Sequence, residues 1–339
     1  MHALVYTAPR GVEVREWPEP QPGPGEVLVQ VRAAAICGSD LHGFLGHSGI
    51  RVPPMIMGHE FAGDVVALGA DVQGVAIGDR VAVQPLVGCG RCPQCLAGYP
   101  NVCPDRRLMG GHLQGAFAER IVAPQRLVYK LPDHVSHAQG ALAEPLANGI
   151  HIAHLAPAPF ADVVVIGAGT LGLMTLQAYK AAGARRVVVL DTASNRLEVA
   201  SRLGAHGTVN PSMADVQASV SDALEGARPT VVVDAVGRTV TRRQALELVA
   251  PRGAVVLLGL AEAESDLDVP RVINHEVRLQ GSYGSCDTDF RTAIDLIADG
   301  RVDVASWVEH YTLERGQEIF TRLVDEPAGL VKAVFTDLP

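Results

Sequence analysis

Four cysteines lie close together in the stretch CGRCPQCLAGYPNVC, at Cys89, Cys92, Cys95 and Cys103. The spacing C-x2-C-x2-C-x7-C puts their thiols on tight turns, close enough to one another to share one tetrahedral ion. Four thiolates close the coordination shell of zinc, so a zinc ion held here supports structure and has no open position for chemistry. The sequence therefore predicts a structural zinc lobe at about residues 86–106.

A second set of metal-binding residue types is spread over three short motifs. Cys37 lies in ICGSDLH, His59 and Glu60 lie in GHEF, and Glu144 lies in AEPL. Each residue alone is ambiguous, because a single cysteine or histidine is more often part of a core. Together they offer the thiolate, imidazole and carboxylate ligands of a catalytic zinc, in which three protein ligands leave one position for exchange.

A glycine-rich run, Gly167-Ala-Gly169-Thr170-Leu171-Gly172, has the pattern G-x-G-x-x-G. It directly follows a continuous apolar strand and opens a helix, which is the context that a dinucleotide site requires. The first glycine allows the tight turn, the second lets a pyrophosphate approach the backbone, and the third lets helix and strand pack closely. The free N–H groups at the start of the helix would face the phosphates.

Asp191 ends the next predicted strand, 24 residues beyond Gly167. A carboxylate at this place binds the ribose hydroxyls and repels a 2′-phosphate, which favours NAD over NADP. Arg196 weakens this preference, because a nearby arginine can pair with a 2′-phosphate. In the alternative interpretation the glycines only make a turn and Asp191 caps the next helix. The order of strand, glycines, helix and acid makes that alternative the weaker one.

The elements that must position these residues change in character near residue 150. Before it, strands are predicted at residues 27–32, 61–68 and 80–83, and Val27, Val29 and Val31 alternate as in a half-buried strand. Frequent Gly and Pro turns indicate a compact β-rich lobe. After it, strand and helix alternate, which predicts a parallel sheet.

The predicted strands of the second half are 163–166, 186–190, 231–233 and 254–258, and its helices are 171–182, 195–203 and 241–249. The tail is predicted to hold a helix at 290–298 and strands at 308–311 and 330–335.

Composition narrows the class of protein. The chain has 339 residues, 48% hydrophobic residues, 19% charged residues and a net charge of −9. It is long enough for two domains, and its acidic charge disfavours nucleic acid and anionic membranes as partners. No signal peptide and no apolar run of membrane-spanning length is expected. Cysteines clustered at metal spacing favour reduced thiols and a cytoplasmic location.

These motifs, in this order, resemble the zinc-dependent medium-chain dehydrogenases, closest to the sorbitol, threonine and butanediol branch. The run Cys37-Gly-Ser-Asp-x-His42, the GHE and GDRV motifs, the four-cysteine lobe, Glu144-Pro145 and the glycine fingerprint carry the resemblance over essentially the whole chain. It implies an α/β protein with a GroES-like β-rich catalytic domain at residues 1–148 and a Rossmann NAD-binding domain at 149–284. Residues 285–339 would return to the catalytic domain.

The resemblance also implies roles for single residues. Cys37 and His59 would be direct ligands of the catalytic zinc, with Glu60 and Glu144 both open as the remaining protein ligand. Asp40 would orient the ring of His59. Ser39 would relay the proton of the alcohol, and His42 would be the outer member of that relay.

Further residues follow from the same resemblance. Val236 and Gly259 would lie beside the nicotinamide ring, and Phe44 and His47 are expected near the substrate.

The expected protein is a zinc-dependent oxidoreductase that transfers a hydride from a secondary alcohol, diol or polyol to NAD. It would bind two zinc ions per chain and form a homotetramer or homodimer. A threonine-type amino-alcohol dehydrogenase and a non-catalytic nucleotide-binding relative are the alternatives. A nucleic-acid-binding zinc module is disfavoured by the acidic composition and the few aromatic residues near the cysteine lobe.

Overall fold

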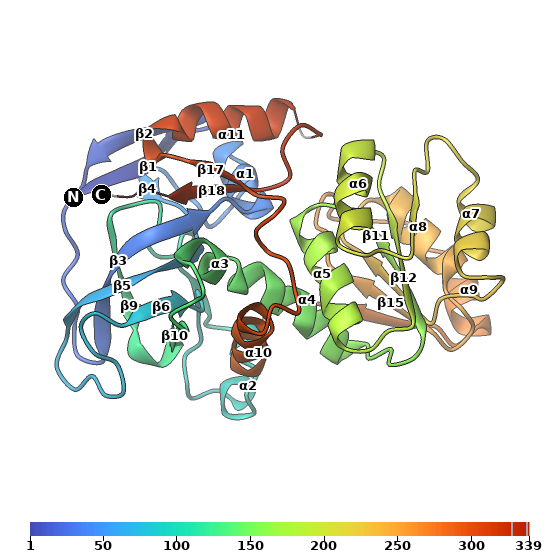
Figure 1. Cartoon of the computed structure of the whole chain (residues 1–339), viewed down its shortest axis with the longest axis horizontal. Coiled ribbons are helices and arrows are strands. Elements are labelled where there is room, and N and C mark those ends of the chain that lie inside the picture. The colour runs from blue at the N-terminus through green and yellow to red at the C-terminus, as the bar shows by residue number, and fades with distance from the viewer. Residues whose placement is uncertain (327, 337, 339) are drawn as a thin grey trace. The chain divides into compact units, whose positions relative to one another are not determined.

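The computed structural model describes residues 1–326, 328–336 and 338, and these divide into two compact units (Figure 1). Unit 1 comprises Met1–Glu144, Cys286–Gly300 and Val304–Pro339. Unit 2 comprises Pro145–Ser285 and Arg301–Asp303. Pro327, Asp337 and Pro339 belong to the predicted C-terminal segment and lie outside the described residues.

Unit 1 is built on a sheet of seven strands with the spatial order β10-β6-β5-β3-β18-β17, in which β9 also pairs with β3. These strands are β3 (Glu26–Ala35), β5 (Glu60–Leu68), β6 (Arg80–Val83), β9 (Arg120–Pro124), β10 (Val128–Lys130), β17 (Glu309–Tyr311) and β18 (Ala333–Thr336). Strand β18 pairs antiparallel with β3, so the C-terminal tail completes a sheet that the first part of the chain begins.

Two smaller sheets complete the strands of unit 1. They contain β1 (His2–Ala8), β2 (Gly11–Glu16) and β4 (Met55–Ile56), and β7 (Leu86–Val87) with β8 (Arg107–Leu108). The helices of this unit are α1 (Gly38–Phe44), α2 (Pro93–Leu96), α3 (His137–Ala141), α10 (Asp287–Ala298) and α11 (Gly316–Asp325), with short 3-10 turns at Pro100–Val102, Gln125–Leu127 and Leu313–Arg315.

Strand β3 corrects one expectation from the sequence. Alternation of Val27, Val29 and Val31 predicted a half-buried strand, yet Leu28 and Gln30 on the opposite face are buried as well. The strand lies in the middle of the sheet, where helix α3 packs against it, while Val27, Val29 and Val31 belong to the main core cluster of unit 1, so neither face is left to solvent. Within this strand Arg32 is exposed and Glu26, its first residue, is half-buried.

Unit 2 contains a six-stranded sheet, all parallel, in the order β13-β12-β11-β14-β15-β16. Its strands are β11 (Asp162–Ile166), β12 (Arg186–Leu190), β13 (Gly207–Val209), β14 (Val231–Asp234), β15 (Ala254–Leu257) and β16 (Arg278–Gly281). This is the strand order of the doubly wound dinucleotide-binding fold. All residues of β11 and β12 are buried, as the continuous apolar runs predicted.

Helices lie on both faces of this parallel sheet (Figure 1). They are α5 (Thr170–Ala181), α6 (Ser194–Arg202), α7 (Val216–Ala223), α8 (Thr239–Leu248) and α9 (Val269–Asn274), while α4 (Ala143–Leu155) begins in unit 1 and continues into unit 2. One core cluster joins α7 and α8 to Val164, Val188 and Val232 of the sheet. Alternation turns Val165 to the other face, where α5 packs closely at Gly172.

The architecture is therefore α/β, with a β-rich part and a part built on a doubly wound parallel sheet, as the sequence predicted. Among the described residues, no helix is both long enough and apolar enough to cross a bilayer.

Candidate zinc and nucleotide sites

Cys37, His59 and Glu60 come together at one end of the large sheet of unit 1. The register of β3 on β5 pairs Ala35 with Glu60, so the chain that leaves β3 toward Cys37 passes beside the start of β5. The ligand atoms of the three residues lie within 4.8 Å of one another. Thiolate, imidazole and carboxylate at this spacing fit a zinc ion, whose ligand bonds are about 2.0–2.3 Å long.

Glu144 is the fourth residue that the sequence offered for this zinc. It lies in the first turn of α4 and is buried. Within the part of the chain that the structure describes, Glu144 does not belong to the group that brings Cys37, His59 and Glu60 within 4.8 Å.

Asp40 stands behind His59 and is completely buried. Its Oδ1 lies 3.3 Å from His59 Nδ1, and its Oδ2 accepts the backbone N–H of Cys37 at 3.0 Å. Burial alone would raise the pKa of Asp40, but His59, Arg51 and the Cys37 N–H outweigh it and hold this pKa at about 2. An ionised Asp40 fixes the ring of His59 so that Nε2 is left for a metal, the arrangement found behind metal-bound histidines.

His59 is only 4% exposed, and burial acts to lower its pKa. The anionic groups of Asp40 and Cys37 overcome this effect and raise the pKa of His59 well above its ordinary value. The same anionic groups that stabilise a proton on the His59 ring also attract a metal cation, which can replace that proton. The charges around His59 are therefore compatible with a bound zinc ion.

Glu60 has a second partner. Lys332, which precedes β18, forms an ion pair with Glu60 Oε2, and both side chains are 1% exposed. The ammonium of Lys332 also donates to the carbonyl oxygen of Ile36 at 2.8 Å. Lys332 thus holds the residue before Cys37 and the residue after His59, although the sequence analysis did not select it.

Ser39 and His42 lie on the short helix α1, which begins after Cys37. Ser39 is half-buried, and its Oγ accepts a hydrogen bond from Arg51 Nη2 at 3.0 Å. His42 is exposed one turn further along, with its ring centroid 6.1 Å from that of His47. Phe44 is completely buried and packs on Phe320, so its expected place near the substrate is wrong.

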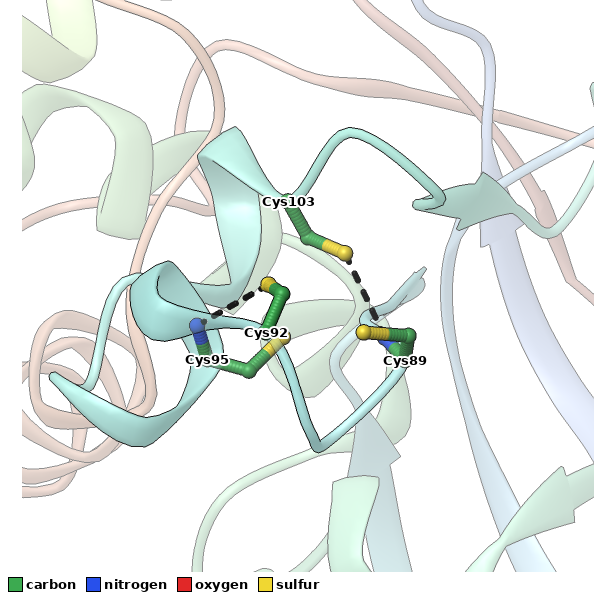
Figure 2. Close-up of side chains that lie close together, drawn as sticks. All are labelled: Cys89, Cys92, Cys95 and Cys103. Carbon is green, nitrogen blue, oxygen red and sulfur yellow. Dashed lines mark hydrogen bonds between the residues drawn. The ribbon is translucent and has the colours of Figure 1, made fainter.

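The four sulfur atoms of Cys89, Cys92, Cys95 and Cys103 converge within 4.8 Å (Figure 2). The backbone N–H of Cys89 points to the sulfur of Cys103, and that of Cys95 points to the sulfur of Cys92, each at 3.4 Å. Pro93 at the start of α2 and the turn at Pro100 fold the lobe around this point. The four-thiol group fits a closed tetrahedral zinc site.

The thiols of this lobe differ in acidity. Backbone N–H groups of Arg91 and Cys92 lower the pKa of Cys89 to about 6, whereas burial and the neighbouring thiols raise the pKa of Cys95 to about 11. Four anionic sulfurs at this distance repel one another, so a bound cation is what allows all of them to ionise together.

The glycine-rich turn of unit 2 follows β11 as predicted. Gly167 has φ +101°, and Gly169 is the N-cap of α5, which begins at Thr170 and continues with Leu171. A Cβ at Gly172 would lie 1.7 Å from the carbonyl oxygen of Gly167, so only glycine lets α5 pack this closely. A Cβ at Gly169 would meet nothing within 4 Å, and this open face over the helix N-terminus suits a pyrophosphate.

Asp191 follows β12 and turns toward this loop. Its Oδ2 accepts the N–H of Ala168 at 2.7 Å, and its Oδ1 accepts the N–H of Ala193 at 2.8 Å. The carboxylate is therefore fixed beside the glycine turn, where it can also receive ribose hydroxyls. Arg196 Nη1 lies 4.0 Å from Asp191 Oδ2, so the arginine that weakens the NAD preference is indeed close.

Val236 and Gly259 meet at the carboxyl ends of β14 and β15. A Cβ at Gly259 would lie 2.1 Å from the carbonyl carbon of Val236, which shows that the two loops touch backbone to backbone. Buried Asp234 accepts the N–H groups of Val236 and Gly237, both at 3.0 Å. Ligands of open α/β sheets bind at this edge, so the structure gathers the predicted cofactor residues on one side of the sheet.

Arg51, Lys332 and Arg242 are the residues near these sites that sequence reasoning missed. Arg242 holds the loop after β15 by donating to the carbonyl oxygens of Gly259 and Glu262. The available signal was a lone charge inside an apolar run, in IRVPPMIM for Arg51 and in LVKAVF for Lys332. A single basic residue in such a run is a weak signal because most are exposed.

Comparison with known proteins shows two domain families in this chain. Residues 23–133 match the alcohol dehydrogenase GroES-like domain, and residues 170–299 match the zinc-binding dehydrogenase domain. An uncharacterised zinc-type alcohol dehydrogenase-like protein, YdjJ of Escherichia coli, is 37% identical over 93% of this chain and 92% of its own length. The L-threonine 3-dehydrogenase of Pyrococcus abyssi is 38% identical over 80% of each chain.

Two solved structures share the fold over nearly the whole chain. An alcohol dehydrogenase from Escherichia coli with bound NADH has a TM-score of 0.93 at 29% identity and covers 99% of each chain. A zinc-binding dehydrogenase from Sinorhizobium meliloti with bound NADP has a TM-score of 0.91 at 31% identity, over 99% of this chain and 98% of its own.

The chain belongs to the zinc-dependent medium-chain dehydrogenase family. It is accordingly an oxidoreductase of a family whose chemistry uses zinc and a nicotinamide cofactor.

Proposed function

We propose that this protein oxidises a secondary alcohol, diol or polyol with NAD as the hydride acceptor, in a reversible reaction. The observation that carries the proposal is the group formed by Cys37, His59 and Glu60, with ionised Asp40 behind the histidine. A group of this composition resembles zinc sites that keep a position open for substrate.

Each residue of the two proposed zinc sites and of the proton relay has a separate proposed role. Cys37, His59 and Glu60 would hold the catalytic zinc, and Cys89, Cys92, Cys95 and Cys103 the structural zinc. Zinc in the first site supplies Lewis acidity that lowers the pKa of the substrate hydroxyl. Ser39 would accept the hydroxyl proton as its own proton leaves, and exposed His42 would release a proton to solvent. The O–H and C–H bonds of the alcohol break, the carbon is oxidised, and NAD is reduced by the hydride.

The preference for NAD is part of the proposal. Asp191 is supported by two backbone N–H groups and would repel a 2′-phosphate, while Arg196 nearby acts in the opposite direction. Asp191→Ala should weaken NAD binding and raise the NADP/NAD ratio of kcat/KM. An unchanged ratio would argue against this role of the carboxylate.

A threonine-type activity is the second candidate, supported by the 38% identity to an L-threonine 3-dehydrogenase. The proposed function is tested by NADH formation with propan-2-ol, butane-2,3-diol, sorbitol and L-threonine, with zinc content measured on the same sample. Two zinc ions per chain and turnover of one of these alcohols are expected. One zinc ion per chain and no turnover would instead favour a non-catalytic nucleotide-binding relative.

We further propose that the protein is a cytoplasmic homo-oligomer, a dimer or tetramer. Strand β16 ends the parallel sheet and exposes Leu279, and Val269 and Ile273 of nearby α9 are exposed too. Such an apolar edge suits pairing with a second copy. Light scattering after size exclusion tests the assembly. The free thiols of all six cysteines support a reducing compartment.

A further inference from the structure

Arg51 is a buried arginine, 5% exposed, in the segment between α1 and β4. Its Nη2 donates to Ser39 Oγ at 3.0 Å and to Asp40 Oδ1 at 3.1 Å. This nitrogen carries two N–H groups, so each acceptor receives one of them. A single guanidinium nitrogen therefore joins the hydroxyl proposed for proton relay to the carboxylate behind His59.

Helix α1 is shaped to let the arginine reach this position. A Cβ at Gly43 would lie 2.3 Å from Cδ of Arg51 and 3.3 Å from its Cβ. The arginine stem thus crosses α1 where the helix carries no side chain, although glycine lowers helix stability by about 0.5–1 kcal/mol relative to alanine. Gly43 and Arg51 form a matched pair.

The charge of Arg51 is balanced locally. Burying a guanidinium is costly unless it is paired and hydrogen-bonded, and Asp40 supplies that pairing. Asp40 in turn keeps Cys37 N–H and His59 Nδ1 as further partners. Asp40 therefore does not need Arg51 in order to hold His59.

The contact with Ser39 has a consequence for proton transfer. A serine hydroxyl has one proton and two acceptor positions, and the bond from Arg51 occupies one of these positions. One acceptor position is left, and the serine proton is directed away from the guanidinium. Ser39 Oγ is thereby prepared to take one proton from a substrate hydroxyl and to give its own proton onward.

We propose that Arg51 is a positioning residue that orients the Ser39 hydroxyl for proton acceptance from the alcohol, an inference that rests on the proposed dehydrogenase function. Arg51 acts through Ser39, and it is not required for holding the metal.

The test is a double-mutant cycle of Arg51→Met and Ser39→Ala with butane-2,3-diol or L-threonine, whichever the wild-type protein turns over faster. Ser39→Ala should lower kcat about 10²-fold, in the range of general acid–base effects. Arg51→Met should lower kcat about tenfold with a smaller change in KM, and Arg51→Lys should restore most of the loss. In the Ser39→Ala background, Arg51→Met should change kcat less than twofold.

Two measurements separate positioning from support of the structure. Zinc retained after a fixed exposure to EDTA should stay close to wild type in Arg51→Met. The melting temperature should fall, because buried Asp40 loses its cation, and it should fall equally in the wild-type and Ser39→Ala backgrounds, whereas the loss of kcat should not be equal in the two. Arg32→Met is the matched control, because Arg32 is an exposed arginine of unit 1 that pairs with Asp64. It should leave turnover and zinc retention unchanged.

Equal losses of kcat from Arg51→Met in the wild-type and Ser39→Ala backgrounds would overturn the inference. So would an unchanged kcat, or a loss of zinc in proportion to the loss of turnover. If the wild-type protein and the Arg32→Met control both fail to reduce NAD with every alcohol of the panel, the dehydrogenase proposal itself fails and the role of Arg51 falls with it.

Discussion

The ion pair between Lys332 and Glu60 offers a direct test of how the zinc-binding end of unit 1 is held. Both side chains are 1% exposed, and Lys332 also donates to the carbonyl oxygen of Ile36. Replacing Lys332 by Met keeps the volume but leaves the Glu60 carboxylate buried without its cation. Breaking a buried pair on one side costs about 3–5 kcal/mol, of which the lost bond to Ile36 contributes about 1 kcal/mol.

The assay can report on this unit alone. Both tryptophans of the chain, Trp17 and Trp307, belong to unit 1, so tryptophan fluorescence during urea unfolding follows that unit. The measurement is made with and without chelator, because Glu60 lies among the residues proposed to bind zinc. A loss of about 3–5 kcal/mol in the zinc-free protein would separate the ion pair from any effect on the metal.

Lys130→Met is the matched control, because Lys130 is an exposed lysine of unit 1 that pairs with Asp79. It should change the free energy of unfolding by less than about 1 kcal/mol. The double variant Lys332→Met/Glu60→Met removes both charges and should be more stable than either single variant. Losses that simply add, or a Lys332→Met variant as stable as the control, would refute the reasoning.

Three further outcomes are expected. Cys95→Ser should lower zinc content by one ion per chain and reduce the melting temperature, whereas loss of activity at an unchanged melting temperature would contradict a structural role for the cysteine lobe. Arg242→Met should weaken NADH binding, measured by NADH fluorescence, because Arg242 holds Gly259 and Glu262; Arg243→Met, at an exposed neighbour, is the control. Burial acts to raise the pKa of Asp162, but hydrogen bonds from Arg185 and Arg186 overcome it and lower that pKa. The Asp162 carboxylate therefore stabilises the fold above its unfolded pKa of about 3.9, and this stability is lost as pH falls through the lower folded value. Asp162→Asn should melt earlier than wild type at pH 7, and the gap should close on acidification; a gap that widens would be inconsistent with this sign.

Much of the fold could be predicted from the sequence, because the apolar runs in the sequence coincide with buried strands in the structure. The apolar runs at β11 and β12 gave strand positions directly, since every residue after the charged first one of each strand is apolar and buried. The glycine turn was predictable because Gly167 and Gly172 meet steric limits that only glycine satisfies. The prediction that β3 is half-buried was wrong, because the alternation of valines does not show whether other parts of the chain cover the opposite face of the strand.

The proposed zinc ligands were predictable for a related reason. Metal ligands must be of a few residue types, so Cys37, His59 and Glu60 stood out by chemistry even though their meeting depends on the register of β3 against β5. The choice between Glu60 and Glu144 was not available from types alone, because both are carboxylates. The closeness of Glu60 to Cys37 depends on the pairing of Ala35 with Glu60, a contact between distant segments.

The buried cations explain what sequence reading could not reach. A lysine or arginine is normally predicted to lie at the surface, because a buried charge is stable only beside a partner, and the sequence does not identify that partner. Lys332 finds its partner 272 positions earlier at Glu60, and Arg51 finds Asp40 across a helix that has glycine at its crossing point. Lys332 stabilises the carboxylate of Glu60, a proposed zinc ligand, and Arg51 stabilises Asp40, which stands behind the proposed ligand His59; neither cation occupies a ligand position. At the zinc-binding end of unit 1, the residue types of the proposed ligands can therefore be recognised in the sequence. The buried cations that hold the neighbouring carboxylates can be recognised only from the folded chain, because folding brings each cation to its partner.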